Sequence, residues 1–79
     1  MKGKVVGLNK DLCAVQVSSG LTIFEILGGH VTEIGDIISG NLESVGSETL
    51  YNETKHEKID TFIEDWSCSP EIAKKFLSR

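Results

Sequence analysis

The balance between β-branched residues and alanine constrains this chain more than any other feature of its sequence. Valine, isoleucine and threonine together number 19 of the 79 residues, whereas alanine occurs only twice. Alanine is the best helix former, and β-branched side chains fit a pleated sheet better than a helix. The sequence therefore predicts a protein built mainly of strands rather than a helical bundle.

Five segments have the pattern expected of short strands. They are rich in apolar residues, and glycine or polar turn residues separate them at a spacing of roughly ten residues. We expect the strands at residues 3–8, 12–18, 21–27, 37–45 and 59–66, with a loop at 52–58. Both faces of 21–27 are largely apolar, which is typical of a strand covered on both sides. Gly40 lies inside the fourth segment, where a glycine favours a bulge or bend.

The C-terminal part of the chain differs in composition from the rest, because all eight glycines lie at or before position 46. Ser69 can cap a helix, and Pro70 suits its first position. We therefore expect a helix at residues 70–78. Its apolar stripe consists of Ile72, Ala73, Phe76 and Leu77. A helix this short is not stable alone in water, so it must dock, and we expect it to cover an open end of the strand domain.

These elements predict one domain over residues 1–79. It consists of a five-stranded barrel like the OB-fold at residues 3–66, with one appended C-terminal α-helix at 70–78. A fragment of a two-layer β-sandwich is the alternative, for which the chain looks too short. The segment from Ile34 to Gly40, a glycine–aspartate turn that feeds a bending strand, resembles a turn and strand of OB-fold RNA-binding repeats and other small barrels.

A second resemblance covers more of the chain. The sequence is similar to the small hydrogenase-maturation chaperones in the arrangement of Gly3-Lys4-Val5-Val6, Ala14-Val15, Gly20 and Gly35-Asp36-Ile37. Those proteins also combine a small barrel with a C-terminal helix, and they depend on a cysteine directly after the initiator methionine. Lys2 stands there in this chain, so the resemblance implies the fold and not the chaperone activity.

Composition places the chain among ordinary soluble globular proteins, with 39% hydrophobic and 25% charged residues. No apolar run approaches the roughly 20 residues of a membrane helix, and no signal peptide follows Met1. We expect a cytoplasmic protein that does not contact membranes. Cys13 and Cys68 are isolated from each other in the sequence, and we expect both to be reduced and packed as small apolar groups.

Recognisable catalytic motifs are absent from the sequence. It has no Gly-x-Ser-x-Gly elbow, no phosphate-binding Gly-x-x-x-x-Gly-Lys loop and no Cys-x-x-Cys pair. Zinc ligands usually occur in pairs at short spacing, whereas the candidates here are isolated: Cys13, His30, His56 and Cys68. We therefore expect no enzyme activity, metal or cofactor. Glu25, the carboxylate of an apolar strand, marks either a site or a barrel rim or exposed patch, and we favour the rim or exposed patch.

Charge separates the two remaining functional hypotheses. The net charge is −4, and residues 21–54 hold six acidic residues and no lysine or arginine, whereas a phosphate backbone is held by clustered basic residues. We first expect a module that binds a protein partner or its own copy, through this acidic segment or an apolar patch around Tyr51 and Trp66. The alternative is single-stranded nucleic acid, with Tyr51 or Trp66 stacking on bases. Its phosphate contacts would be Lys55 and Lys58, with Lys2, Lys4 and Lys10. The three phenylalanines are assigned to the core.

Overall fold

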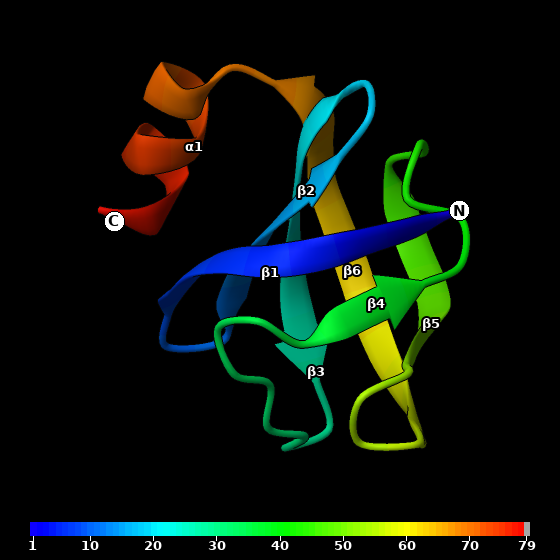
Figure 1. The fold of residues 1–79 in the computed structure, drawn as a ribbon. Helices are drawn as coiled ribbons and strands as arrows, with labels where there is room; N and C mark the ends of the chain where they lie inside the picture. The colour runs from blue at the N-terminus through cyan, green and yellow to red at the C-terminus, as the bar shows by residue number, and fades with distance from the viewer. Residues whose placement is uncertain (79) are drawn as a thin grey trace.

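A computed structural model describes residues 1–78, which form six strands and one helix (Figure 1). The elements are β1 (Lys2–Asn9), β2 (Leu12–Val17), β3 (Gly20–Leu27), β4 (Ile37–Ser39), β5 (Gly46–Asn52), β6 (Glu57–Cys68) and α1 (Pro70–Leu77). All strand pairs are antiparallel, and the strands close into a barrel in the order β1-β2-β3-β6-β5-β4. The predicted class, a β-barrel with one appended helix, is confirmed. The barrel is consistent with an OB-like fold, but it has six strands rather than five.

The barrel interior is the main hydrophobic core, and every strand contributes to it. Inward-pointing residues alternate with outward ones along the strands, as the pleat requires, except where the register shifts in β1 and between β3 and β6. The buried set is Val5, Cys13, Val15, Val17, Phe24, Ile26, Ile38, Leu42, Leu50, Ile59 and Ile63. Gly3 also points inward, where a Cβ would lie 2.5 Å from Val15 Cγ1 and 2.7 Å from the Gln16 carbonyl oxygen. Glycine is therefore required at this position by packing.

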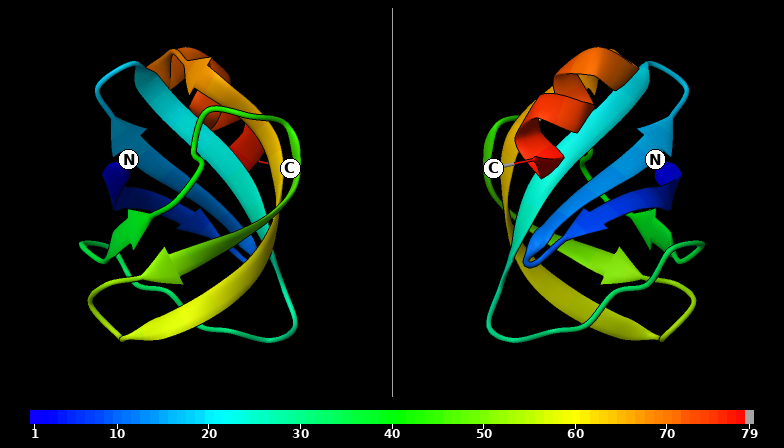
Figure 2. Two further views of the ribbon diagram at one scale, coloured as in Figure 1. Left: turned by 90° about the vertical axis from the view of Figure 1, so that its right-hand side faces the viewer. Right: turned by 90° about the vertical axis from the view of Figure 1, so that its left-hand side faces the viewer.

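The helix packs against the outside of the barrel wall and does not cover an open end (Figure 2). This corrects the expected position. Its physical reason lies in β2 and β3, whose outward residues Ala14, Leu21 and Ile23 form an apolar strip that α1 buries with Ala73. Phe76 and Leu77 pack against the same strip, while Ile72, expected in the stripe, is 43% exposed. The strand predicted to be covered on both sides, β3, is covered by the interior along its length but by this helix only over its first half, since Glu25 is half-buried and Leu27 is 39% exposed.

Both ends of the helix are fixed by side chains. Ser69 is the N-cap, and its Oγ accepts a hydrogen bond from the backbone N–H of Ile72, with Pro70 at the first helical position as predicted. At the other end, Asn9 Nδ2 donates to the carbonyl oxygen of Leu77. The end of α1 is thus attached to β1 by this hydrogen bond, and its start is joined to β6 by the chain.

Two strand boundaries differ from the prediction. The segment 37–45 ends as a strand at Ser39, because Gly40 adopts a φ of 133° and redirects the chain instead of bending a longer strand. Leu42 then enters the core, and its carbonyl accepts a hydrogen bond from Thr22 Oγ1 at 2.7 Å. The loop predicted at 52–58 is shorter, since β5 extends through Asn52 and β6 begins at Glu57. Within residues 1–78, no helix is long and apolar enough to cross a membrane.

Candidate functional site

Of the four predicted site residues, the structure brings two together. Tyr51 of β5 and Lys58 of β6 are cross-strand partners on the outer wall, where Tyr51 is half-buried and Lys58 is exposed. Trp66 is 38% exposed, but it lies eight residues farther along β6, which corresponds to about 26 Å of strand. The expected patch around Tyr51 and Trp66 is therefore two separate places on the surface.

Lys55, the fourth predicted residue, belongs to a polar cluster that joins two loops. Its Nζ lies 2.6 Å from Glu33 Oε1 and 3.2 Å from Asp36 Oδ2. Asn52, which is fully buried, donates from Nδ2 to the same Asp36 oxygen at 2.9 Å and accepts a hydrogen bond from the Lys55 backbone N–H at 3.0 Å. These four residues, called the Asp36 cluster below, attach the β3–β4 connection to the turn between β5 and β6. The ammonium group of Lys55 is therefore paired with carboxylates of the same chain.

The Asp36 cluster also sets the ionisation of its members. Burial opposes the charged form of Asp36, but hydrogen bonds from Asn52, from the Glu33 backbone and from Lys55 outweigh it, so the pKa of this carboxyl is lowered. For Lys55, the hydrogen bond to Glu33 and the contact with Asp36 outweigh desolvation and raise its pKa. Both groups carry their charge at neutral pH, so the cluster holds a carboxylate and an ammonium.

The acidic segment at 21–54 does not form one open acidic surface. Glu33 and Asp36 are paired with Lys55. Glu48 accepts a hydrogen bond from Ser44 Oγ at 3.2 Å, and Glu53 accepts one from Ser39 Oγ at 2.7 Å. Much of the negative charge that the sequence concentrates in this segment is thus engaged within the fold.

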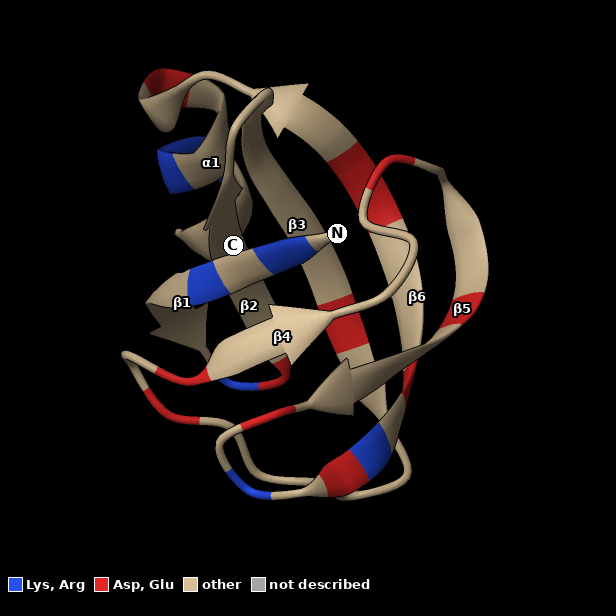
Figure 3. Ribbon diagram, turned by 45° about the vertical axis from the view of Figure 1, so that its right-hand side comes forward, with Lys and Arg blue, Asp and Glu red and all other residues tan. Residues whose placement is uncertain are grey.

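Charge is instead divided between the two halves of the barrel (Figure 3). The neighbouring strands β4, β1 and β2 contain Lys2 and Lys4 and, within their bounds, no acidic residue. The other three neighbours, β3, β6 and β5, contain one lysine and six acidic residues, which are Glu25, Glu48, Glu57, Asp60, Glu64 and Asp65. The barrel therefore has a basic half, on which part of α1 packs, and an acidic half.

An apolar groove lies between α1 and the basic half, and its volume is about 160 Å³. Eight described residues line it: Val6, Gly7, Ala14, Leu21, Pro70, Ala73, Lys74 and Leu77. Val6 is the extra residue of a bulge in β1, where the pairing shifts between Val5 and Gly7, and its side chain is 48% exposed. A Cβ at Gly7 would lie 2.6 Å from Leu77 Cδ1, so glycine allows the last turn of the helix to approach this strand. This feature is called the helix groove below.

The helix groove was not found by sequence reasoning, although part of its signal is present. In β1, Lys2, Lys4 and Val6 lie at alternate positions on the outer face and are exposed, whereas beyond the bulge Leu8 pairs with the interior residue Cys13. The local signal is thus one exposed valine after two exposed lysines, and single exposed apolar residues are common on protein surfaces. The other side of the groove comes from residues 70–77, and no local pattern in the sequence brings them next to β1.

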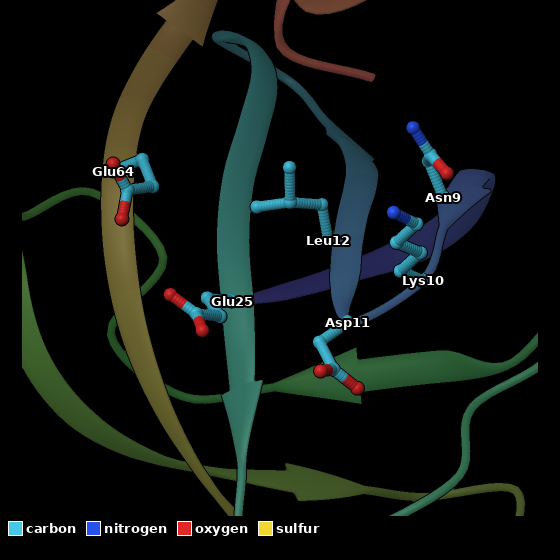
Figure 4. A pocket seen from close by; sticks show the side chains of 6 residues that line it. All are labelled: Asn9, Lys10, Asp11, Leu12, Glu25 and Glu64. Carbon is cyan, nitrogen blue, oxygen red and sulfur yellow. The ribbon is translucent and has the colours of Figure 1, made fainter. Parts of the chain in front are cut away.

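A second hollow, of about 280 Å³, lies on the acidic half beside the turn between β1 and β2 (Figure 4). Its described lining residues are Asn9, Lys10, Asp11, Leu12, Glu25 and Glu64. Glu25, singled out in the sequence, is half-buried on the outer wall and faces this hollow rather than the barrel interior. Asp11, Glu25 and Glu64 make the hollow, called the acidic hollow below, attractive to a cationic group.

Next to the acidic hollow, the structure corrects one aromatic assignment. Phe24 is fully buried, and Phe76 of α1 is partly buried against the barrel wall, as expected of core residues. Phe62 is instead 40% exposed on the outer face of β6, because the inward positions of this strand are those of Thr61 and Ile63. Its cross-strand partner on β3 is Glu25.

Both cysteines are free and buried. Desolvation raises the pKa of Cys13 to about 11, against a hydrogen-bond contact of 3.1 Å between its Sγ and Thr32 Oγ1. Desolvation and Asp65 raise the pKa of Cys68 to about 11. Such thiols are neutral at physiological pH and poor nucleophiles. Among residues 1–78, no group of three or more His, Cys, Asp and Glu side chains is arranged to hold a metal ion.

Comparison of the chain with protein-family models, with curated proteins and with solved structures found no match. The functional argument therefore proceeds from the geometry of the helix groove, the acidic hollow and the charge distribution.

Proposed function

We propose that this protein is a non-catalytic binding module whose helix groove accepts an apolar side chain of a protein partner. The observation that carries the proposal is the apolar groove beside α1, in which Val6 stays 48% exposed although the helix packs directly next to it. Of the eight described residues that line the groove, Lys74 alone carries an ionisable group. The lining suits burial of an apolar group rather than acid–base or nucleophilic chemistry.

The closed barrel supports binding through side chains. Many small β domains bind peptides by adding a strand to an exposed sheet edge. In residues 1–78 the sheet closes on itself, and one short stretch, residues 46–50 of β5, lacks a strand partner on its β4 side because β4 pairs only with Tyr51 and Asn52. Most of the surface offered to a partner is therefore the outer wall and α1, and the helix groove is the apolar recess that they form together.

The volume of the helix groove and the lysines beside it restrict the kind of partner that can bind. An enclosed apolar cavity of about 150 Å³ accommodates benzene, so the groove, at about 160 Å³, has room for one phenyl ring or aliphatic side chain. Lys74 stands at its rim, and Lys4 lies two residues before Val6 on the same face of β1. The partner segment should therefore carry an apolar anchor with carboxylates beside it, because opposite charges orient an encounter.

The test uses a fluorescein-labelled synthetic peptide that has one phenylalanine flanked by glutamates, with fluorescence anisotropy as the readout. Binding should weaken about tenfold or more in Val6→Asp, because burial of an aromatic side chain contributes roughly 1.5–3 kcal/mol. A peptide with lysines in place of the glutamates should bind the wild type more weakly than the glutamate peptide does, because its charges repel Lys4 and Lys74. Val31→Asp is the matched control, since Val31 is 66% exposed in the β3–β4 connection. Equal binding of both peptides, or an unchanged affinity in Val6→Asp, would contradict the proposal.

A second candidate function, binding of single-stranded nucleic acid, is supported by one row of side chains. The register joins Lys2, Ser39, Tyr51 and Lys58 across four neighbouring strands on the outer wall. Three strand spacings, roughly 14 Å, separate the two lysines, with Tyr51 between them as a stacking surface. Its test is a labelled oligonucleotide: affinity must fall steeply with salt and be lost in Tyr51→Ala. Salt-independent or absent binding would remove this candidate.

A further inference from the structure

The chain itself carries a surface that complements the helix groove. We infer that a second copy of this chain occupies the groove, and that it does so with the exposed ring of Phe62. The inference rests on the proposed function, because it names the partner that the groove takes. Its basis is the division of charge over the barrel, which places an apolar anchor among carboxylates on one half and an apolar groove with lysines on the other.

Phe62 has the surroundings that the groove requires of its ligand. Its side chain is 40% exposed on the outer face of β6. Glu25 is its cross-strand partner, and Asp60 and Glu64 lie two residues before and after it along the strand. Residues two apart on a strand share a face, and cross-strand partners do too. The ring is therefore bordered by three carboxylates on the acidic half.

The groove matches this anchor in size and in charge. A phenyl ring is the size of benzene, which an apolar cavity of about 150 Å³ accommodates, and the groove measures about 160 Å³. Lys74 at the rim and Lys4 on β1 supply the ammonium groups that would face the carboxylates around Phe62. Exposed ion pairs contribute little to affinity. The ring thus provides the binding, and the charges fix its orientation.

The two surfaces lie on different parts of the barrel, which determines the kind of assembly. In the order of the barrel, β2 and β3 stand between β1, which lines the groove, and β6, which carries Phe62. The contact is therefore heterologous, with different patches on the two copies, and each bound copy still offers a free groove or a free Phe62. Such copies associate head to tail, so the average mass rises with concentration instead of stopping at a symmetric dimer.

Sedimentation equilibrium of the full chain from micromolar to millimolar concentration tests the inference with two variants. Val6→Glu blocks the groove and keeps Phe62, whereas Phe62→Ser removes the anchor and keeps the groove. Each variant alone should stay at the monomer mass of 8.6 kDa. An equimolar mixture should form a one-to-one complex of twice that mass, because each variant supplies the surface that the other lacks. Val31→Ser is the control and should associate as the wild type does. Circular dichroism and urea unfolding verify that both variants are folded.

The outcomes separate this inference from the proposed function. A wild-type average mass that rises with concentration, together with recovery of the complex in the mixture, supports it. A wild-type monomer at millimolar concentration overturns it, and so does association that Phe62→Ser leaves unchanged. If the wild type is monomeric but still binds the phenylalanine–glutamate peptide in the groove, the proposed function stands and the partner is another protein. If the protein neither associates nor binds the peptide, both fail.

Discussion

Asn52→Ala should lower the free energy of unfolding by about 3 kcal/mol. The side chain is fully buried and makes two hydrogen bonds, one to the Asp36 carboxylate at 2.9 Å and one from the Lys55 backbone at 3.0 Å. A hydrogen bond to a charged group contributes roughly 1.5–3 kcal/mol and a neutral one about 1 kcal/mol. A chain of this length has a total stability of roughly 4–12 kcal/mol, so the loss is a large fraction.

Urea denaturation followed by circular dichroism measures this change, and thermal unfolding should show a Tm lower by about 12 °C or more. Asn41→Ala is the matched control. Asn41 is exposed and accepts one long hydrogen bond, at 3.4 Å from the Glu43 backbone, so its loss should change stability by less than about 0.5 kcal/mol. A loss below about 1 kcal/mol in Asn52→Ala would refute the reasoning that the Asp36 cluster holds the two loops together.

The same variant should also change the dependence of stability on pH. Asp36 has a lowered pKa in the folded state, so its contribution is present above the pKa of the unfolded chain and is lost as pH falls through the folded pKa. Without Asn52, a major cause of the lowered pKa is gone, and the folded and unfolded values move closer. Stability of Asn52→Ala should therefore fall less steeply than that of the wild type on acidification below about pH 4. Parallel acid titrations would contradict this assignment.

Three further predictions concern packing, thiols and backbone strain. Gly3→Ala should lower stability by about 2 kcal/mol in urea, because a Cβ would lie 2.5 Å from Val15 Cγ1; an unchanged midpoint would contradict the packing. Cys13 and Cys68, with pKa values raised to about 11, should resist a colorimetric disulfide reagent near neutral pH until urea unfolds the chain, whereas rapid labelling of the native protein would exclude their burial. His56→Gly should raise stability by about 0.5 kcal/mol, since His56 has a φ of 56°, and a lower melting temperature would argue against a strained turn.

Some of the fold could be predicted because local chemistry determines it. The alternation in residues 12–27 divides the side chains of β2 and β3 into the same two sets that lie inside and outside the barrel, and Ser69 with Pro70 marks the start of the helix. The strand β5 was missed for an equally physical reason. Its outward positions, such as Ser47 and Thr49, face solvent and are polar, and Asn52 points inward as part of the Asp36 cluster. No alternation of apolar residues marks such a strand.

The candidate site was predictable only in part. Tyr51 and Lys58 were chosen from composition, and the register makes them neighbours, but Trp66 lies too far along β6 to join them. The helix groove depends on a bulge at Val6 and on contact between β1 and Leu77, which are some 70 residues apart in the chain. Contacts of this kind arise from tertiary packing and leave no local pattern. The cytoplasmic location stays a prediction from the sequence.

The most direct test of the proposed function is an NMR titration of the ¹⁵N-labelled protein with the phenylalanine–glutamate peptide, followed by mapping of the amide shifts. Binding in the helix groove predicts shifts confined to residues around Val6, Gly7, Ala73 and Lys74, with little change at Tyr51 and Lys58. Shifts centred on Tyr51 and Lys58, or no shifts at saturating peptide, would contradict the account.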